Sequence, residues 1–288
     1  MFRGMRVGVG LPNSVPGTSG RALVEWARRA EELAFSSLGV VDRVAWECFE
    51  PLTVLAAAAA ATDRIELATT IVVGPLRNTA LLANEAATID ALSEGRLTLG
   101  LSVGARIEDF DVAGVEHRGR GDRLTDQLVE LRSRWNGSAP GARPGRAGGP
   151  RLLVGGTSDV SYYRMAWHSD GYVHGGGPPR AFEQAARTAR AAWADAGRRG
   201  APLLWGQGYF ALGEDAREVG ATYMREYYAF VGPFAERIVE GLLTTPQDVL
   251  GFARGYSEAG CDELVLMPAV ADRVQLDRLA EILAGATL

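Results

Sequence analysis

The chain has 288 residues, a length typical of one α/β barrel, with 47% hydrophobic and 23% charged residues. Its net charge is −5, and no basic tract with interleaved aromatic residues is present, which argues against a nucleic-acid-binding protein. It contains no lysine, which excludes Schiff-base and pyridoxal-phosphate enzymes, P-loop NTPases and protein kinases, because their chemistry needs a lysine amine.

The few cysteines and histidines also limit the possible chemistry. Cys48 and Cys261 form neither a metal-binding spacing nor a disulfide framework, and only three histidines are present, so we expect no metal site. No apolar run approaches the roughly 18 residues of a membrane span, and the first residues lack a signal-peptide pattern. We therefore expect a cytoplasmic protein that does not interact with membranes.

Apolar runs typical of buried strands alternate with helical patterns along the whole chain. The strands are expected at residues 5–11, 37–41, 65–72, 97–103, 151–154, 171–173, 203–212 and 263–267. The helices are expected at residues 21–34, 55–61, 81–92, 123–135, 161–167, 181–196, 215–230, 247–259 and 274–283. Only residues 136–150 are too rich in glycine and proline for either, and they predict a surface loop.

This alternation predicts a parallel sheet, because parallel neighbours need crossover connections. Eight strand–helix units close naturally into a (β/α)8 TIM barrel, which we expect to form a single domain over residues 1–288. An open, doubly wound sheet is the alternative.

In such a barrel, the loops after the carboxyl ends of the strands build the active site. These loops are polar, rich in glycine and poor in metal ligands, which favours an organic cofactor. In residues 151–160, a strand is followed by Gly155, Gly156, Thr157 and Ser158 and then by a helix. This pattern is typical of a phosphate site at a helix N-terminus, although it also fits an ordinary tight turn.

Several stretches resemble one family, the bacterial-luciferase-like flavin and deazaflavin oxidoreductases. They are the opening strand at residues 7–13, the acidic helix end, strand and Asp42 at residues 30–42, the long block 65–104, and the Gly-x-Arg-x-x-Asp-Phe turn at residues 104–110. The Val-Gly-Gly element at residues 154–156 and the Ser-Asp-Gly-Tyr element at residues 169–172 also match. The resemblance covers most of the chain.

The resemblance implies a barrel that binds FMN or the 5-deazaflavin coenzyme F-420 at its mouth. It places Gly155 and Gly156 against the phosphate-bearing tail of the cofactor, with Thr157 and Ser158 as hydrogen-bond donors to that tail. It further implies that strand three ends in a bulge at Thr69, Thr70 and Ile71, with a non-proline cis peptide bond between Thr70 and Ile71. An ordinary strand end is the alternative.

Other cofactor-binding residues follow from the same resemblance. Gly104 and Arg106 match positions that line the cleft, although Arg106 could instead pair with Glu108 or Asp109. Asp42 matches an aspartate near the coenzyme ring, whereas Arg77 fits a structural arginine at a helix start.

The sequence departs from the family pattern at Arg43, where many deazaflavin-dependent relatives have a histidine implicated in proton handling. A guanidinium does not lose its proton in a protein, so Arg43 can hold an anion but cannot act as an acid or base. His174 and Glu47 are therefore the candidate proton donors. The aromatic run within residues 223–238 predicts core packing, a partner-helix face or a lid over the cofactor.

The sequence thus predicts an oxidoreductase that uses reduced coenzyme F-420 for hydride transfer to a C=C, C=N or C=O bond of a small molecule. An FMN-dependent monooxygenase supplied by a separate flavin reductase, and a non-catalytic flavin-binding protein, are the alternatives. The resemblance also implies a homodimer.

Overall fold

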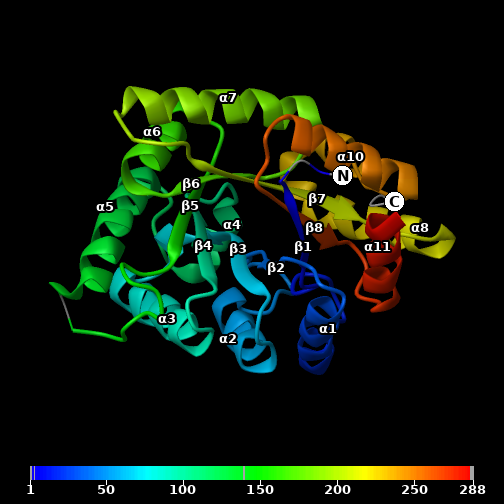
Figure 1. The fold of residues 1–288 in the computed structure, drawn as a ribbon, viewed down its shortest axis with the longest axis horizontal. Helices are drawn as coiled ribbons and strands as arrows, with labels where there is room; N and C mark the ends of the chain where they lie inside the picture. Colours follow the sequence, from blue (N-terminus) through cyan, green and yellow to red (C-terminus); the bar gives the residue numbers. More distant parts are fainter. Residues whose placement is uncertain (1, 3, 139, 286–288) are drawn as a thin grey trace.

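A computed structural model describes residue 2, residues 4–138 and residues 140–285. Its centre is a closed barrel of eight parallel strands, each paired with its neighbours in chain order (Figure 1). The strands are β1 Arg6–Gly10, β2 Ser37–Val40, β3 Glu66–Val73, β4 Leu97–Ser102, β5 Arg151–Gly155, β6 Gly171–His174, β7 Leu203–Phe210 and β8 Glu263–Pro268. The predicted barrel is confirmed, and the open sheet is excluded because β8 pairs with β1.

Helices surround the barrel as an outer layer (Figure 1). The α-helices are α1 Gly20–Glu32, α2 Pro51–Ala61, α3 Thr79–Leu92, α4 Ile107–Ala113, α5 Arg120–Ser133, α6 Asp159–His168, α7 Pro179–Asp195, α8 Glu214–Tyr227, α9 Phe234–Val239, α10 Pro246–Glu258 and α11 Val274–Gly285. Shorter turns are η1 Gly74–Leu76, η2 Arg134–Ser138 and η3 Ala229–Val231.

The predicted single helix at residues 215–230 is wrong at its C-terminal end. Helix α8 ends at Tyr227 and is followed by the short elements η3 and α9. Gly232 has a φ of 59°, which breaks the helical path, and Pro233 follows it immediately. The chain therefore leaves the α8 axis, and η3 and α9 pack against α8.

The glycine- and proline-rich residues 136–150 were predicted to contain no helix. Their first residues belong to η2, a π-helical turn in which Gly137 has a φ of 85°. Further along, the N–H of Arg146 donates to Asp90 Oδ2 at 2.8 Å, which ties this segment to α3. The segment thus packs on the body of the protein.

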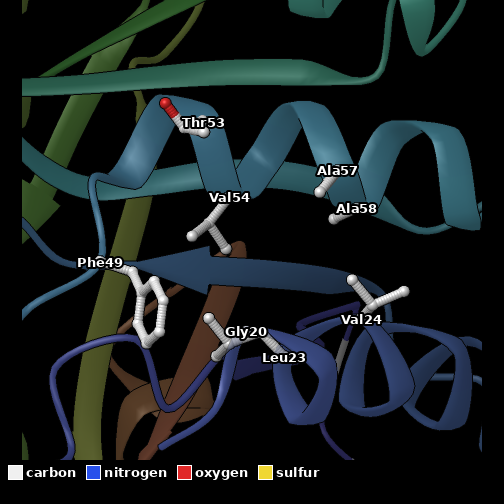
Figure 2. Close-up of a pocket in the computed structure, with 8 residues that line it drawn as sticks. All are labelled: Gly20, Leu23, Val24, Phe49, Thr53, Val54, Ala57 and Ala58. Atoms are coloured by element: carbon white, nitrogen blue, oxygen red, sulfur yellow. The ribbon is translucent and has the colours of Figure 1, made fainter.

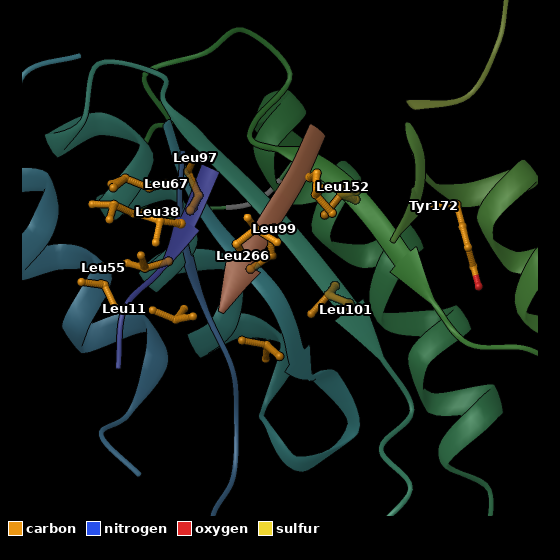
Figure 3. Packing of buried hydrophobic residues seen from close by; sticks show 14 of the residues in the cluster. Leu11, Leu38, Leu55, Leu67, Leu97, Leu99, Leu101, Leu152, Tyr172 and Leu266 are labelled. Atoms are coloured by element: carbon orange, nitrogen blue, oxygen red, sulfur yellow. The ribbon is translucent and has the colours of Figure 1, made fainter. Parts of the chain in front are cut away.

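Strand alternation divides the core into two clusters. The outer cluster lies between the strands and the helices, and Figure 3 shows its leucines on neighbouring strands packing together with Leu55 of α2. The inner cluster fills the barrel and includes Leu153, Val173, Trp205 and Val265. Adjacent residues of one strand therefore face different environments.

On β7, two glycines face the helical layer. A Cβ atom at Gly206 would lie 2.4 Å from the ring of Tyr256, and one at Gly208 would lie 2.6 Å from the ring of Phe252. Both rings belong to α10. Since the rings occupy the space that strand side chains would need, α10 packs directly on the backbone of β7.

The outer layer also contains an apolar groove of about 130 Å³ between α1 and α2 (Figure 2). It is lined by side chains such as Leu23, Phe49 and Val54, and by none of the predicted site residues. The groove therefore belongs to the packing of two neighbouring helices.

The outer cluster should dominate the stability of the barrel. Leu266 on β8 is fully buried, so Leu266→Ala should lower the free energy of unfolding by about 2–5 kcal/mol, as is usual for a deleted core side chain. Leu81→Ala, on an exposed position of α3, is the control and should change it by less than about 0.5 kcal/mol. Urea unfolding measures both, and equal losses would contradict this assignment of the core.

Candidate active site at the barrel mouth

The carboxyl ends of the strands meet at one rim of the barrel, which we call the mouth. A non-proline cis peptide bond joins Thr70 and Ile71 there, as predicted, and the pairing of β3 with β4 shifts between Thr69 and Val72. Thr69 Oγ1 donates to the carbonyl of Gly100 at 2.7 Å, so this side chain is used within the sheet. Thr70 lies beside Met267 of the inner cluster.

Ile71 occupies the wall of the mouth next to two glycines. Its Cγ2 atom lies 3.3 Å from the position of a Cβ at Gly100 and 3.5 Å from that at Gly155. The Ile71 side chain is partly exposed, whereas Thr69 and Thr70 are buried. The bulge therefore presents an apolar surface to solvent at the ends of β3, β4 and β5.

The turn from β5 to α6 requires a glycine at position 156. Gly156 has a φ of +134°, and a Cβ there would lie 2.4 Å from Ser161 Oγ. Ser158 Oγ accepts from the Ser161 N–H and caps α6, while Thr157 is exposed. The positive end of the α6 dipole thus adjoins bare backbone, an arrangement that suits a phosphate group.

Asp42 is buried and already has partners. It accepts from the Val73 N–H at 2.9 Å and from Arg77 Nη1 at 2.6 Å, and Arg77 also donates to Glu50 at 2.9 Å. Burial raises the pKa of Asp42, and the Arg77 guanidinium opposes that rise. Asp42 and Arg77 therefore join the loops after β2 and β3.

Two arginines at the mouth bind the same backbone oxygen. Arg43 Nη1 and Arg106 Nη2 donate to the carbonyl of Tyr227 at 3.2 and 3.3 Å. Because Tyr227 is the last residue of α8, its carbonyl lies at the negative end of the helix dipole. We call this arrangement the arginine clasp.

Acidic and aromatic groups complete the arginine clasp. Asp109, which the sequence offered as a partner for Arg106, instead pairs with Arg43 and accepts the Ala45 N–H at 2.8 Å. The Arg106 guanidinium lies 4.5 Å from the ring centre of Tyr227 and 4.2 Å from that of Phe230, within cation–π range. The buried Arg106 Nε atom has no partner among the described residues.

Three tyrosines, two on α8 and one immediately after it, cover one side of the mouth. The Tyr223 hydroxyl lies 2.7 Å from Ser14 Oγ, after β1, and the Tyr228 hydroxyl donates to that of Tyr209 on β7 at 3.1 Å. Tyr227 contacts Trp46, after β2, edge to face. The predicted aromatic run thus packs over the ends of β7, β1 and β2, while Ile71, Gly104 and Gly156 stay partly exposed on the other side.

The structure does not bring the three predicted catalytic residues together. His174 alternates with Val173, which faces the lumen, and its ring contacts Phe182 of α7 and Tyr256 of α10 in the helical layer. Glu47 is exposed and accepts from the Gly17 N–H at 2.6 Å. Of the three, only Arg43 takes part in the arginine clasp.

Comparison with known proteins identifies the family of this barrel. The model of the luciferase-like monooxygenase family matches residues 5–267. The chain belongs to this family.

Individual relatives of the luciferase-like protein are distant. It is 26% identical over 187 residues to an uncharacterized protein of Mycobacterium tuberculosis, covering 53% of the chain and 65% of that protein. It is 32% identical over 125 residues to an F420-dependent glucose-6-phosphate dehydrogenase of Amycolatopsis mediterranei, covering 40% of the chain and 38% of the enzyme. The chain thus matches less than two thirds of the length of these curated relatives.

Solved structures share the fold across almost the whole chain. An F420-dependent secondary alcohol dehydrogenase in complex with an F420-acetone adduct superposes with a TM-score of 0.80 at 16% identity, covering 96% of this chain and 98% of that one. The oxygenating constituent of 3,6-diketocamphane monooxygenase from Pseudomonas putida, in complex with FMN, gives a TM-score of 0.72 at 19% identity and covers 91% of both chains. At these identities the likeness concerns the fold.

One polar residue of this luciferase-like barrel, Gln207, was not among the predicted site residues. It lies on β7 between Trp205 and Tyr209, whose side chains belong to the inner cluster, so it also faces the lumen. Its Nε2 donates to the Gly175 carbonyl at 3.0 Å, whereas its buried Oε1 has no partner among the described residues. Strand alternation alone would have placed this amide inside the barrel.

Metal-binding and membrane-spanning features are absent from the described part of the luciferase-like chain. No group of three or more His, Cys, Asp or Glu side chains is arranged to hold a metal ion within residues 4–138 and 140–285. Among the helices of these residues, none has the length and apolar character needed to cross a bilayer.

The position of His174 predicts a measurable pH dependence of stability. Burial lowers the pKa of His174 to about 4, whereas an exposed histidine titrates near 6.5. Between these values the unfolded chain binds a proton that the folded chain does not, so the free energy of unfolding falls as the pH decreases. Between about pH 7.5 and pH 5, the free energy of unfolding of wild type, measured in urea, should therefore fall by about 2 kcal/mol more than that of His174→Gln. Equal losses in the two proteins would show that this imidazole is protonated in the folded state.

Proposed function

We propose that this protein is an oxidoreductase that binds reduced coenzyme F-420 at the mouth and reduces a C=C, C=N or C=O bond of a small organic substrate. The observation that carries the proposal is the side-chain-free corner at Gly155 and Gly156, which lies beside the Ile71 bulge and opens onto the N-terminus of α6. When bound, the reduced deazaflavin supplies a hydride, and the product takes up one proton.

The residues at the mouth fit both ends of such a cofactor. Gly156 lies partly exposed beside the α6 N-terminus in a backbone conformation that favours glycine, and Thr157 and Ser158 there offer hydroxyl donors for a phosphate-bearing tail. The unpaired Oε1 of Gln207 can accept a hydrogen bond from a ring N–H, because a buried acceptor is otherwise costly to leave unsatisfied. We assign Thr70, Ile71 and Gly104 to the wall against the ring system.

Charged residues at the mouth orient ligands, and they do not transfer protons. Arg43 and Arg106 keep their charge at all working pH values, so they can attract an anionic substrate or stabilise developing negative charge. Asp42 acts through the Arg77 pair by holding the loops around the mouth. Burial raises the pKa of Tyr209 and of Tyr228, so both hydroxyls stay protonated. Because Tyr228 donates its proton to Tyr209, the Tyr209 hydroxyl is the one that can donate a hydrogen bond to a substrate oxygen.

Support for F-420 comes from relatives. The glucose-6-phosphate dehydrogenase of Amycolatopsis mediterranei and the secondary alcohol dehydrogenase are both F420-dependent. The fold likeness to the oxygenating constituent of 3,6-diketocamphane monooxygenase, in complex with FMN, supports a second candidate, an FMN-dependent monooxygenase that receives reduced FMN from a separate reductase. Assembly as a homodimer and a cytoplasmic location stay predictions.

Cofactor titration separates these candidates. Coenzyme F-420, followed by its fluorescence, should bind at least about tenfold more tightly than FMN, and a suitable substrate should restore the absorbance of the oxidised form from the reduced one. Tighter FMN binding, with reduced FMN and oxygen converting a substrate to a product that contains one added oxygen atom, would instead establish the monooxygenase. Binding of either cofactor with no turnover across a panel of enones, imines and ketones would contradict both activities.

A matched pair of helix caps tests the phosphate corner. Ser158 caps α6 at the mouth and Ser19 caps α1 elsewhere, each accepting from a backbone N–H three residues later. Ser158→Ala and Ser19→Ala should each lower the free energy of unfolding by about 1 kcal/mol, because each removes one cap. Only Ser158→Ala should also weaken F-420 binding, by about tenfold, since a charge-assisted hydrogen bond is lost. Unchanged F-420 affinity in Ser158→Ala would remove Ser158 from the site.

A further inference from the structure

A recess of about 390 Å³ lies at the amino ends of the strands, the end of the barrel opposite the mouth. It is bordered by Arg151, the first residue of β5, by Asp170, which immediately precedes β6, and by Leu203, the first residue of β7. Residues 146–150, from the glycine- and proline-rich segment, form another part of its lining. The proposed redox function does not use this region.

Positive charge dominates the lining of the recess. Four arginines contribute to it, namely Arg132 of α5, Arg146, Arg151 and Arg198, whereas the only acidic residue in the lining is Asp170. Asp170 is paired with Arg132, and Arg151 is paired with Glu66 at 3.2 Å. A concentration of arginine is unusual in a chain whose net charge is −5.

Two of these guanidinium groups have no acidic partner. Within the ion pairs of residues 4–138 and 140–285, neither Arg146 nor Arg198 takes part. Arg146 donates to the Gly95 carbonyl, and Arg198 donates to the carbonyls of Ala166 and Ser169 at 2.7 and 3.2 Å. Hydrogen bonds to backbone carbonyls fix these side chains, but each full positive charge lacks a carboxylate to compensate it.

The arginines are held in place without a ligand. The Arg198 guanidinium lies 3.9 Å from the ring centre of Trp193, which also lines the recess. Arg132 Nη1 donates to the carbonyls of Gly148 and Pro150 at 3.2 and 3.1 Å. The buried Nη1 of Arg146 has no partner among the described residues. Because these side chains are already ordered, a ligand would lose little free energy in immobilising them.

We propose that this recess is a second binding site, for a small anion that carries two or more phosphoryl groups. Its volume is in the range of small-molecule sites, and guanidinium groups match phosphate oxygens in geometry as well as charge. Two uncompensated arginines on different walls favour a ligand with more than one phosphoryl group. The site is separate from the mouth and does not depend on the proposed redox activity.

Calorimetric titration with inorganic pyrophosphate tests the proposal. Wild type should bind saturably, and Arg146→Gln and Arg198→Gln should each weaken the affinity by at least about tenfold, because each removes one uncompensated charge. Arg187→Gln is the matched control, since Arg187 lies on an exposed position of α7 outside the recess and loses the same charge. Its affinity for pyrophosphate should stay within about twofold of wild type.

The outcomes that overturn the proposal are distinct from loss of folding. Circular dichroism and thermal unfolding without pyrophosphate identify any variant that does not fold, and Arg151→Gln, at another position of the lining, then replaces it. Absence of saturable binding to wild type, or equal weakening in all variants including Arg187→Gln, would refute the recess as a site. Weakening by Ser158→Ala but not by the recess variants would place pyrophosphate at the mouth and would also refute it.

Discussion

Closure of the sheet between β8 and β1 is the constraint on which the rest of the structure depends. The two strands pair in parallel from Arg6 with Glu263 to Val9 with Leu266, which completes the ring. Because every strand runs in the same direction, the ring collects all carboxyl ends at one rim and all amino ends at the other. Residues as far apart in the chain as Ser14 and Tyr223 are thereby brought into contact, and the arginine recess is gathered at the opposite end. A gap in the ring would separate the residues that meet at the mouth and those that line the arginine recess.

The mouth is asymmetric for an electrostatic reason. A helix C-terminus presents carbonyls with partial negative charge, and here Arg43 and Arg106 converge on the last carbonyl of α8. The aromatic faces of Tyr227 and Phe230 also contact the Arg106 guanidinium, so the arginines hold this helix end through its carbonyl and its rings. The other half of the rim, around Ile71 and Gly156, has no such cover and stays accessible. A ligand therefore has one side from which to enter.

Local patterns were sufficient to predict the strands and their closure into a barrel, and the resemblance to the family implied the cis peptide bond at Thr70–Ile71. They were not sufficient for α4, a seven-residue helix that starts at Ile107 and whose N-cap residue, Arg106, makes no side-chain cap hydrogen bond. His174 was assigned to the mouth because it ends a strand, but alternation with Val173 turns it to the outside. Arg43 and Arg106 were correctly placed near the rim, yet their shared partner is 184 and 121 residues away in the chain, a separation that no local pattern can reveal. Prediction failed where tertiary contacts decide the side-chain partners.

The outer face of β7, which has glycine at two positions, limits how the sequence of this barrel can change. With the rings of Tyr256 and Phe252 resting on Gly206 and Gly208, even a methyl group at either glycine would lift α10 from the sheet. Inherited change along β7 is therefore confined to the inward positions 205, 207 and 209, where a new side chain alters the packing inside the barrel and leaves the contact with α10 in place. This strand can change from its lumen side only.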